Sequence, residues 1–121
     1  MAAPATICAI ERSAVCVVDG DTLRIGERRV RLTGFDTPEI EGACPAERVK
    51  AVEAREELLR WLNAGPFELD GGADPERDKY GRELRAARRG SDLLADHMLA
   101  AGLAHGGGWA DWGEIDWCAG T

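Results

Sequence analysis

Four acidic side chains lie in two short segments whose composition suits metal-assisted chemistry. Asp19 and Asp21 flank a glycine between two apolar runs, and Asp36 and Glu39 follow a third apolar run. Ca²⁺ and Mg²⁺ prefer carboxylate and carbonyl oxygens, whereas zinc and iron sites commonly use His or Cys. Since both histidines lie far from these acids in the chain, the four residues favour a hard divalent cation. The simpler interpretation, in which the acids only form turns, stays open at this point.

Two arginines could supply the positive charge that phosphate chemistry requires. Arg31 follows the first acidic pair by one predicted strand, and Arg82 ends a polar loop. Hydrolysis of a phosphodiester needs an activated water and groups that stabilise the charge of the transition state and of the leaving oxygen. A guanidinium group can donate two parallel hydrogen bonds to phosphate oxygens. Carboxylates, a metal ion and arginines together indicate phosphodiester hydrolysis, although a single surface arginine is more often only a solvated charge.

The net charge limits the kind of nucleic-acid partner. The 121 residues carry a formal charge of -7 at pH 7, whereas proteins that grip duplex DNA usually carry an excess of Lys and Arg. Positive charge is nevertheless concentrated in two places. We therefore expect salt-sensitive binding of short or single-stranded DNA or RNA rather than tight duplex binding. The two clusters are Arg24, Arg28, Arg29 and Arg31, and Arg82, Arg85, Arg88 and Arg89.

Turn residues and alternating hydrophobicity predict five short strands in a single α+β domain. A five-stranded barrel is the simplest closure that removes exposed strand edges. We assign the folded core to about residues 14–104 and expect the Gly- and Trp-rich tail, 105–121, to be irregular. The predicted strands lie within 14–25 (two strands around a turn at 19–22), 29–32, 66–69 and 83–88.

Apolar residues at helical spacing predict two helices. The first covers 45–63, with Pro45 in its first turn. The second begins with Ser91 or Asp92 as its N-cap and ends at Gly102. The predicted buried faces are Val49, Val52, Leu58, Leu59 and Leu62 in the first helix, and Leu93, Leu94, Met98 and Leu99 in the second.

Four cysteines without CxxC spacing indicate disulfides rather than a zinc site. Three pairings are possible for four cysteines. We favour Cys8 with Cys16 and Cys44 with Cys118, because the second bridge would pin the Gly-rich tail to the body of the protein. Four free, buried thiols remain the alternative.

The cysteines also bear on where the protein is found. Disulfides form in oxidising compartments, which favours an extracytoplasmic location, periplasmic or secreted. The first residues lack the basic and apolar segments of a signal peptide, so we hypothesise that a leader was removed and Met1 added for expression. Mass spectrometry of protein from the source cell tests this, because an intact Met1 would contradict it. No apolar run approaches the roughly 18 residues that cross a bilayer, so no membrane partner is expected.

Three sequence blocks occur together in an order that is similar to one known family. VVDGDTLRI covers residues 17–25, RLTGFDTPE covers 31–39 and DKYGREL covers 78–84, and a weaker block, Gly-Leu-Ala, covers 102–104. Together they extend over about three quarters of the chain. The sequence resembles the staphylococcal-nuclease (thermonuclease) family. The resemblance implies an OB-fold barrel of five strands with two to three helices.

The same resemblance implies a metal site. Asp21 and Asp36 look like direct ligands of Ca²⁺, and the main-chain carbonyl of Thr37 completes the protein's share. Asp19 lies nearby in the outer shell. Because Mg²⁺ and Mn²⁺ also accept oxygen ligands, the identity of the ion stays open.

The resemblance also implies catalytic roles. Glu39 matches the general base or water-positioning residue, and Arg31 and Arg82 match the pair that holds the phosphate and stabilises its transition state. Lys79 and Tyr80 match residues near the terminal phosphate of the nucleotide. An endonuclease of this family hydrolyses DNA and RNA with little sequence preference, breaks the bond to the 5′ oxygen and leaves 3′-phosphate ends. We expect it to act as a monomer.

The tail departs from the family pattern. Where the family's prototype has tyrosines that pack on the nucleotide base, this chain has Trp109, which could stack on a base or cover the barrel with its neighbouring tryptophans. No amphipathic run follows Ala104, so a third terminal helix is not expected. Two other function classes stay open: a non-catalytic OB-fold module that binds nucleic acid or a partner, and a purely structural domain held by disulfides.

Overall fold

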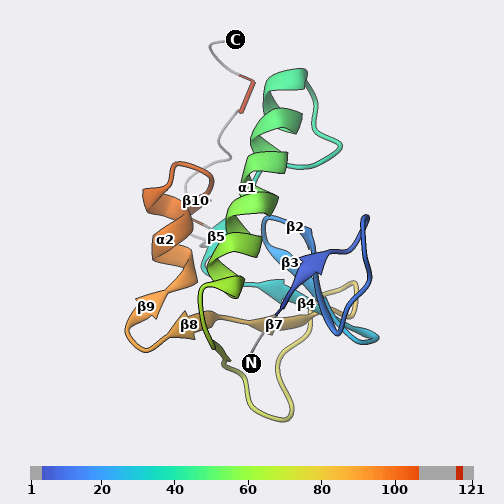
Figure 1. The fold of residues 1–121 in the computed structure, drawn as a ribbon, viewed down its shortest axis with the longest axis vertical. Coiled ribbons are helices and arrows are strands. Elements are labelled where there is room, and N and C mark those ends of the chain that lie inside the picture. Colours follow the sequence, from blue (N-terminus) through green and yellow to red (C-terminus); the bar gives the residue numbers. More distant parts are fainter. Residues whose placement is uncertain (1–3, 107–116, 119–121) are drawn as a thin grey trace.

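Two helices lie beside a mixed five-stranded sheet in the computed structural model, which describes residues 4–106 and 117–118 (Figure 1). Helix α1 (Pro45–Asn63) runs across the strands, and the shorter α2 (Leu94–Ala100) packs beside it. The predicted α+β class is therefore confirmed. The strands are β1 (Thr6–Ile7), β2 (Val15–Asp19), β3 (Thr22–Ile25), β4 (Arg28–Leu32), β5 (Phe35–Asp36), β6 (Glu68–Leu69), β7 (Glu83–Arg85), β8 (Ala87–Arg89), β9 (Asp92–Leu93) and β10 (His105–Gly106).

The five-stranded sheet has the order β1-β2-β3-β4-β7. Strands β2, β3 and β4 form the predicted antiparallel meander, while β1 pairs in parallel with β2 and β7 pairs in parallel with β4. Because β1 and β7 are edge strands, the sheet is open within the described residues and does not close as the predicted barrel. Strand β1 also extends the folded core ahead of the predicted start at residue 14.

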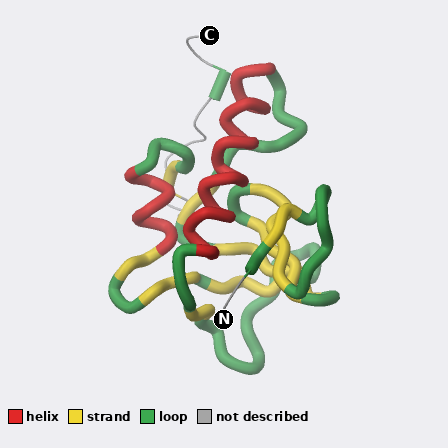
Figure 2. Tube along the Cα trace, viewed as in Figure 1, coloured by secondary structure: helices red, strands yellow, loops and turns green. Residues whose placement is uncertain are grey.

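The predicted strand at 83–88 is divided between two sheets. Strand β7 pairs with β4, whereas β8 pairs with β6 and β9 in a three-stranded sheet. The chain changes partners at Ala86, which separates the two strands. The long segment between β6 and β7 forms a loop, as predicted (Figure 2).

Helix α1 packs through small residues in its first half. A Cβ atom on Gly20 would lie 2.8 Å from the Cβ of Ala54, so the helix approaches the β2–β3 turn too closely for a larger side chain. Val49 and Val52, which helical spacing predicts to be buried, are instead 60% and 38% exposed. The predicted inner face is wrong in this half and right in the second. The buried residues of α1 are Ala51, Ala54, Leu58, Trp61 and Leu62.

Helix α2 begins without the predicted side-chain cap. Its N-cap is Leu93, which makes no capping hydrogen bond. Asp92, which we predicted with Ser91 as a candidate cap, lies in β9 and accepts a hydrogen bond from the indole N–H of Trp61 at 3.2 Å.

The end of helix α2 is as predicted, because Gly102 has a φ of 74°, a conformation that commonly terminates helices. Of the predicted inner face, Leu94 and Met98 are buried, and Leu93 and Leu99 are exposed.

Both favoured disulfides are present. Cys8 is bonded to Cys16, and Cys44 is bonded to Cys118, so the alternative of four free thiols is wrong. Two disulfides are compatible with an oxidising compartment. Within the described part of the chain, neither helix has the length and hydrophobicity needed to cross a membrane.

Candidate functional site

The β2–β3 turn and the segment after β5 meet at one end of the sheet. The N–H of Leu32 donates to the carbonyl of Asp21 at 2.8 Å, and the N–H of Thr37 donates to Asp21 Oδ2 at 3.3 Å. A Cβ atom on Gly20 would lie 2.8 Å from the Thr37 side chain, so the turn needs glycine for this close approach. These contacts bring the two acidic segments together as the sequence predicted.

Arg31 lies between the two predicted metal ligands. Its Nη1 is 3.3 Å from Asp21 Oδ2, and its Nη2 is 3.1 Å from Asp36 Oδ1. The same guanidinium group donates to the carbonyls of Leu32 and Phe35. Because four protein groups hold it, the arginine has a fixed orientation beside both carboxylates, which is the preorganisation that electrostatic catalysis requires.

Burial and neighbouring negative charges raise the pKa of three acids at this site, Asp19, Asp36 and Glu39. Burial and then repulsion from Asp21 raise the pKa of Asp19 from its ordinary 3.8 to about 7. Burial raises the pKa of Asp36, against the opposing effect of Arg31. Burial and then the charges of Asp21 and Asp36 raise the pKa of Glu39. The site therefore holds more negative charge than Arg31 neutralises, and a bound cation would relieve the repulsion.

Glu47 holds the segment that carries Glu39, a role that our sequence analysis missed. Its Oε2 accepts a hydrogen bond from the N–H of Glu39 at 3.0 Å, and its Oε1 accepts one from the N–H of Ala43 at 3.0 Å. Cys44 is the N-cap of α1, and its Sγ accepts a hydrogen bond from the N–H of Glu47 at 3.4 Å. The missed signal was the spacing of Cys44 and Glu47, which matches a capping box with sulfur in place of a hydroxyl.

The predicted phosphate-binding residues of the 78–84 block gather just before β7. Arg82 Nε donates to Asp78 Oδ2 at 2.6 Å, and the Arg82 guanidinium lies over the Tyr80 ring at 5.4 Å. Lys79 Nζ lies 5.2 Å from the centre of the same ring. Within the described residues, no ion pair or hydrogen bond joins this group to the four acids.

Register places Leu84 and Arg31 on one face of the sheet, and Arg82 lies two residues before Leu84. Leu84 is the partner of Arg31 in the β4–β7 ladder, and residues two apart on a strand point to the same side. The alternation of burial is consistent with this, because Glu83 and Arg85 are buried while Arg82 and Leu84 are partly exposed. Because Arg82 precedes β7, the ladder itself places only Leu84 beside Arg31.

Strand β10 brings a second unpredicted residue to the site. His105 pairs with Asp36 in the β5–β10 ladder, and its Nε2 lies 3.7 Å from Asp36 Oδ2. The His105 ring centre is 6.2 Å from that of Trp117, which is next to the disulfide-bonded Cys118. The tail is thus not wholly irregular, since its first two residues form β10. Trp109, the predicted base-stacking residue, lies outside the described residues.

Most of the remaining arginines in the two predicted clusters of positive charge contact protein partners. The guanidinium groups meet carboxylates or carbonyls that lie far away in the sequence, apart from two local pairs, Arg24 with Glu27 and Arg85 with Glu83. The contacts are Arg28 and Arg85 with Glu83, Arg88 with Glu68, Arg29 with the Tyr80 carbonyl, Arg89 with the carbonyls of Trp61, Gly65 and Pro66, and Arg24 with Glu27.

The donor set at the acidic end suits a hard cation. The predicted ligands there are two carboxylates and the carbonyl of Thr37, a residue whose N–H donates to Asp21, and carboxylate and carbonyl oxygens are the ligands that Ca²⁺ takes. No three His, Cys, Asp or Glu side chains within 4–106 and 117–118 are grouped as ligands of one ion. Two carboxylates and one carbonyl, completed by water, do not require such a group. Asp21, Asp36 and Thr37 therefore fit the ion that the family resemblance implies.

Raising the pH is expected to destabilise the metal-free protein. The folded state keeps a proton on Asp19 up to about pH 7, whereas the unfolded chain loses it near its ordinary pKa of 3.8. The stability that the protonated Asp19 contributes is therefore fully present below pH 3.8 and is lost as the pH rises through about 7. Ca²⁺ binds ionised carboxylates, so it should raise the Tm more at about pH 8 than at about pH 5.

Thermal unfolding with Ca²⁺ or with chelator at the two pH values measures this effect. Asp19→Asn should remove the loss of stability with pH in the metal-free protein. Asp74→Asn, at an exposed aspartate on the 70–82 loop, is the matched control and should retain it. Equal shifts of Tm by Ca²⁺ at both pH values would contradict the prediction.

Comparison with known proteins does not place the chain in a family. No model of a known protein family matches the sequence, and no curated protein matches it.

Proposed function

We propose that the protein is a Ca²⁺-dependent nuclease that hydrolyses phosphodiester bonds in DNA and RNA with little sequence preference. The observation that carries this proposal is the position of Arg31, which contacts both Asp21 and Asp36 from a third segment of the chain. An arginine held between two acids at a strand end provides both halves of a phosphate site: oxygen ligands for a cation and a guanidinium group for the phosphate.

Each residue of the site then has a role in an in-line displacement. Glu39 accepts a proton from the attacking water, and its raised pKa brings it nearer to the range of an effective base. Arg31 and Arg82 bind the phosphate oxygens and stabilise their charge as the water oxygen bonds to phosphorus. The bond to the 5′ oxygen breaks, this oxygen takes a proton from solvent and leaves as a 5′ hydroxyl, and the other product keeps a 3′ phosphate. Asp21, Asp36 and Thr37 would hold Ca²⁺, which would supply positive charge to the phosphate.

The finer fold assignment belongs to the same proposal. If β7 and β8 are taken as one strand bent at Ala86, that strand pairs with β4 in one half and β6 in the other. Such a shared, bent strand is how a five-stranded OB-fold barrel is built from two sheets. The two disulfides support an extracytoplasmic location, and the same proposal has the protein act as a monomer.

Incubation of the protein with denatured DNA tests the function directly. With Ca²⁺ we expect fragments that end in 3′ phosphate, and with chelator we expect none. Terminal phosphatase treatment followed by gel electrophoresis identifies the ends. Folded protein that yields no fragments with Ca²⁺, Mg²⁺ or Mn²⁺ would overturn the proposal, and retained binding of the oligonucleotide would then support the non-catalytic module.

A further inference from the structure

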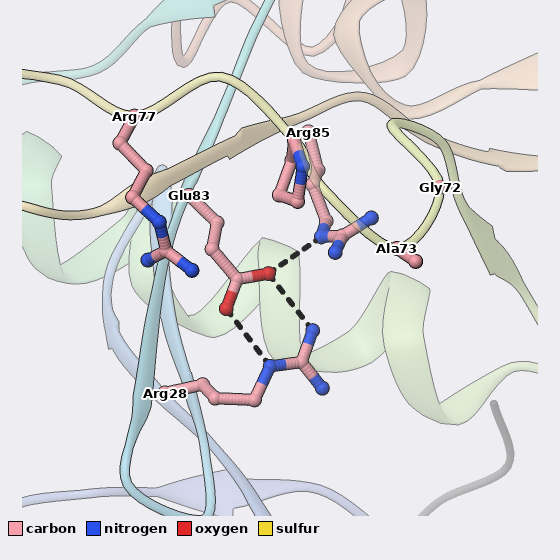
Figure 3. Close-up of a pocket in the computed structure, with 7 residues that line it drawn as sticks. Arg28, Gly72, Ala73, Arg77, Glu83 and Arg85 are labelled. Atoms are coloured by element: carbon pink, nitrogen blue, oxygen red, sulfur yellow. Dashed lines mark hydrogen bonds and ion pairs between the residues drawn. The ribbon is translucent and has the colours of Figure 1, made fainter.

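A hollow of about 400 Å³ lies between the start of β4, the start of β7 and the loop that precedes β7 (Figure 3). Arg28, Arg77 and Arg85 contribute three guanidinium groups to its lining, and Glu83 contributes the single carboxylate. In Figure 3 the guanidinium groups of Arg28 and Arg85 surround the Glu83 carboxylate, and Arg77 extends toward it from the loop. The remaining lining residues are Gly72, Ala73 and Pro75.

This hollow is separate from the site of Arg31. Glu83 and Arg85 pair with Val30 and Leu32 in the β4–β7 ladder, and both apolar partners are fully buried. The hollow therefore opens on the core side of these strands, whereas Arg31 lies on the other side.

The charges lining the hollow do not balance. Arg28 donates to both oxygens of Glu83, at 2.8 and 2.9 Å, and Arg85 Nε donates to one of them at 2.8 Å. The hydrogen bonds from Arg28 lower the pKa of Glu83 to about 2, so this carboxylate is ionised. Three guanidinium groups against one carboxylate leave an excess of two positive charges, in a chain whose net charge is -7.

Several donors in the hollow also lack a protein acceptor. Within the described residues, Arg28 Nη1 and Arg85 Nη2 make no hydrogen bond, and Arg77 donates only through Nη1, to the Gly81 carbonyl at 3.2 Å. The acids nearest in the chain, Asp74 and Glu76, line a different hollow beside Pro75. Unused, preorganised guanidinium donors that converge on a polar hollow are typical of an oxyanion site.

We propose that this hollow binds a phosphate group, either free or at the end of a nucleotide. The excess of two positive charges matches a phosphate dianion, and the three arginines present the planar donor pairs that phosphate oxygens accept. The volume leaves space for a substituent on the phosphate as well as for the group itself. This inference does not depend on the proposed nuclease function, because it involves neither the acidic residues nor Arg31 and Arg82.

Titration of the protein with inorganic phosphate by calorimetry, at constant ionic strength set with chloride, tests the proposal. Arg77→Gln removes a charged donor at an exposed position and should raise the Kd by about tenfold. Arg12→Gln, at an exposed arginine away from the hollow, is the matched control and should leave the Kd unchanged. Equal affinities of the wild type and Arg77→Gln would overturn the assignment.

Arg31→Gln distinguishes the two phosphate sites. If the hollow is the site, this variant loses nuclease activity but binds inorganic phosphate as the wild type does. If Arg31→Gln abolishes phosphate binding, the titration reports the carboxylate site and the proposal fails. A nucleoside monophosphate, titrated in parallel, identifies the source: tighter binding than inorganic phosphate assigns a nucleotide, and equal binding assigns free phosphate.

Discussion

Replacing Glu39 with glutamine is expected to lower the rate of DNA cleavage by about two to four orders of magnitude, the usual contribution of a general base. Glutamine keeps the shape of the side chain but cannot accept the proton of the attacking water. The backbone contact from Glu47 to the Glu39 N–H does not involve the substituted side chain, so the fold and the Tm should be retained. Initial rates on denatured DNA with saturating Ca²⁺ measure the change.

Glu41→Gln is the matched control, because Glu41 is an exposed acid two residues along the same segment. Its cleavage rate should remain within a factor of about two of the wild type. A Glu39→Gln enzyme with a near-normal rate would show that another group activates the water.

In the same assay Arg82→Ala should lower the cleavage rate by about two to three orders of magnitude, as expected for one group that stabilises the transition state. Arg12→Ala is the control and should lower the rate little.

Removing the Cys44–Cys118 disulfide is expected to lower the free energy of unfolding by about 4 kcal/mol, because the bridge closes a long loop in the unfolded chain. The two cysteines are 74 residues apart in the sequence. Cys44→Ala combined with Cys118→Ala removes the bridge without leaving a reactive thiol. Urea unfolding followed by tryptophan fluorescence gives the change.

The Cys8–Cys16 bridge is the internal comparison, since its cysteines are only 8 residues apart. The same relation between loop length and entropy gives a smaller contribution, about 2.5 kcal/mol. Loss of the longer bridge should also weaken Ca²⁺ binding, because Cys44 adjoins the segment held by Glu47 and Cys118 adjoins Trp117 beside His105. If the unfolding midpoint of the Cys44→Ala, Cys118→Ala variant equals that of the wild type, the Cys44–Cys118 bridge does not stabilise the fold.

Local chemistry allowed the β2–β3–β4 meander, the start of α1 and the end of α2 to be predicted. The turn at Asp19 and Asp21 and the alternation of β4 are read from neighbouring residues, as are Pro45 at the start of α1 and Gly102 after α2. These features depend on steric limits within a few residues, which any tertiary environment must respect. The same reasoning placed Asp19 and Asp21 at the turn between two strands and Asp36 at the end of a third.

The inner face of α1 could not be predicted, because it depends on what the helix packs against. Helical spacing and hydrophobicity predicted that Val49 and Val52 face the core. The buried face instead includes Ala54, because only a small side chain fits where the helix approaches Gly20. In a similar way, Glu83 and Arg85 look like an exposed pair in sequence, and only the parallel ladder with β4 buries them beside Arg28. Packing between distant segments overrides local preference in both cases.

Which carboxylates and guanidinium groups the chain carries can be read directly from its residues. What those groups contact depends on how distant segments pack. The tertiary structure placed Arg31 between Asp21 and Asp36, engaged most other arginines with protein acceptors, and added Glu47 and His105 to the site. The physical reason is that side-chain identity is a local property, whereas a charge finds its partner through strand register and helix packing, which join residues far apart in the chain.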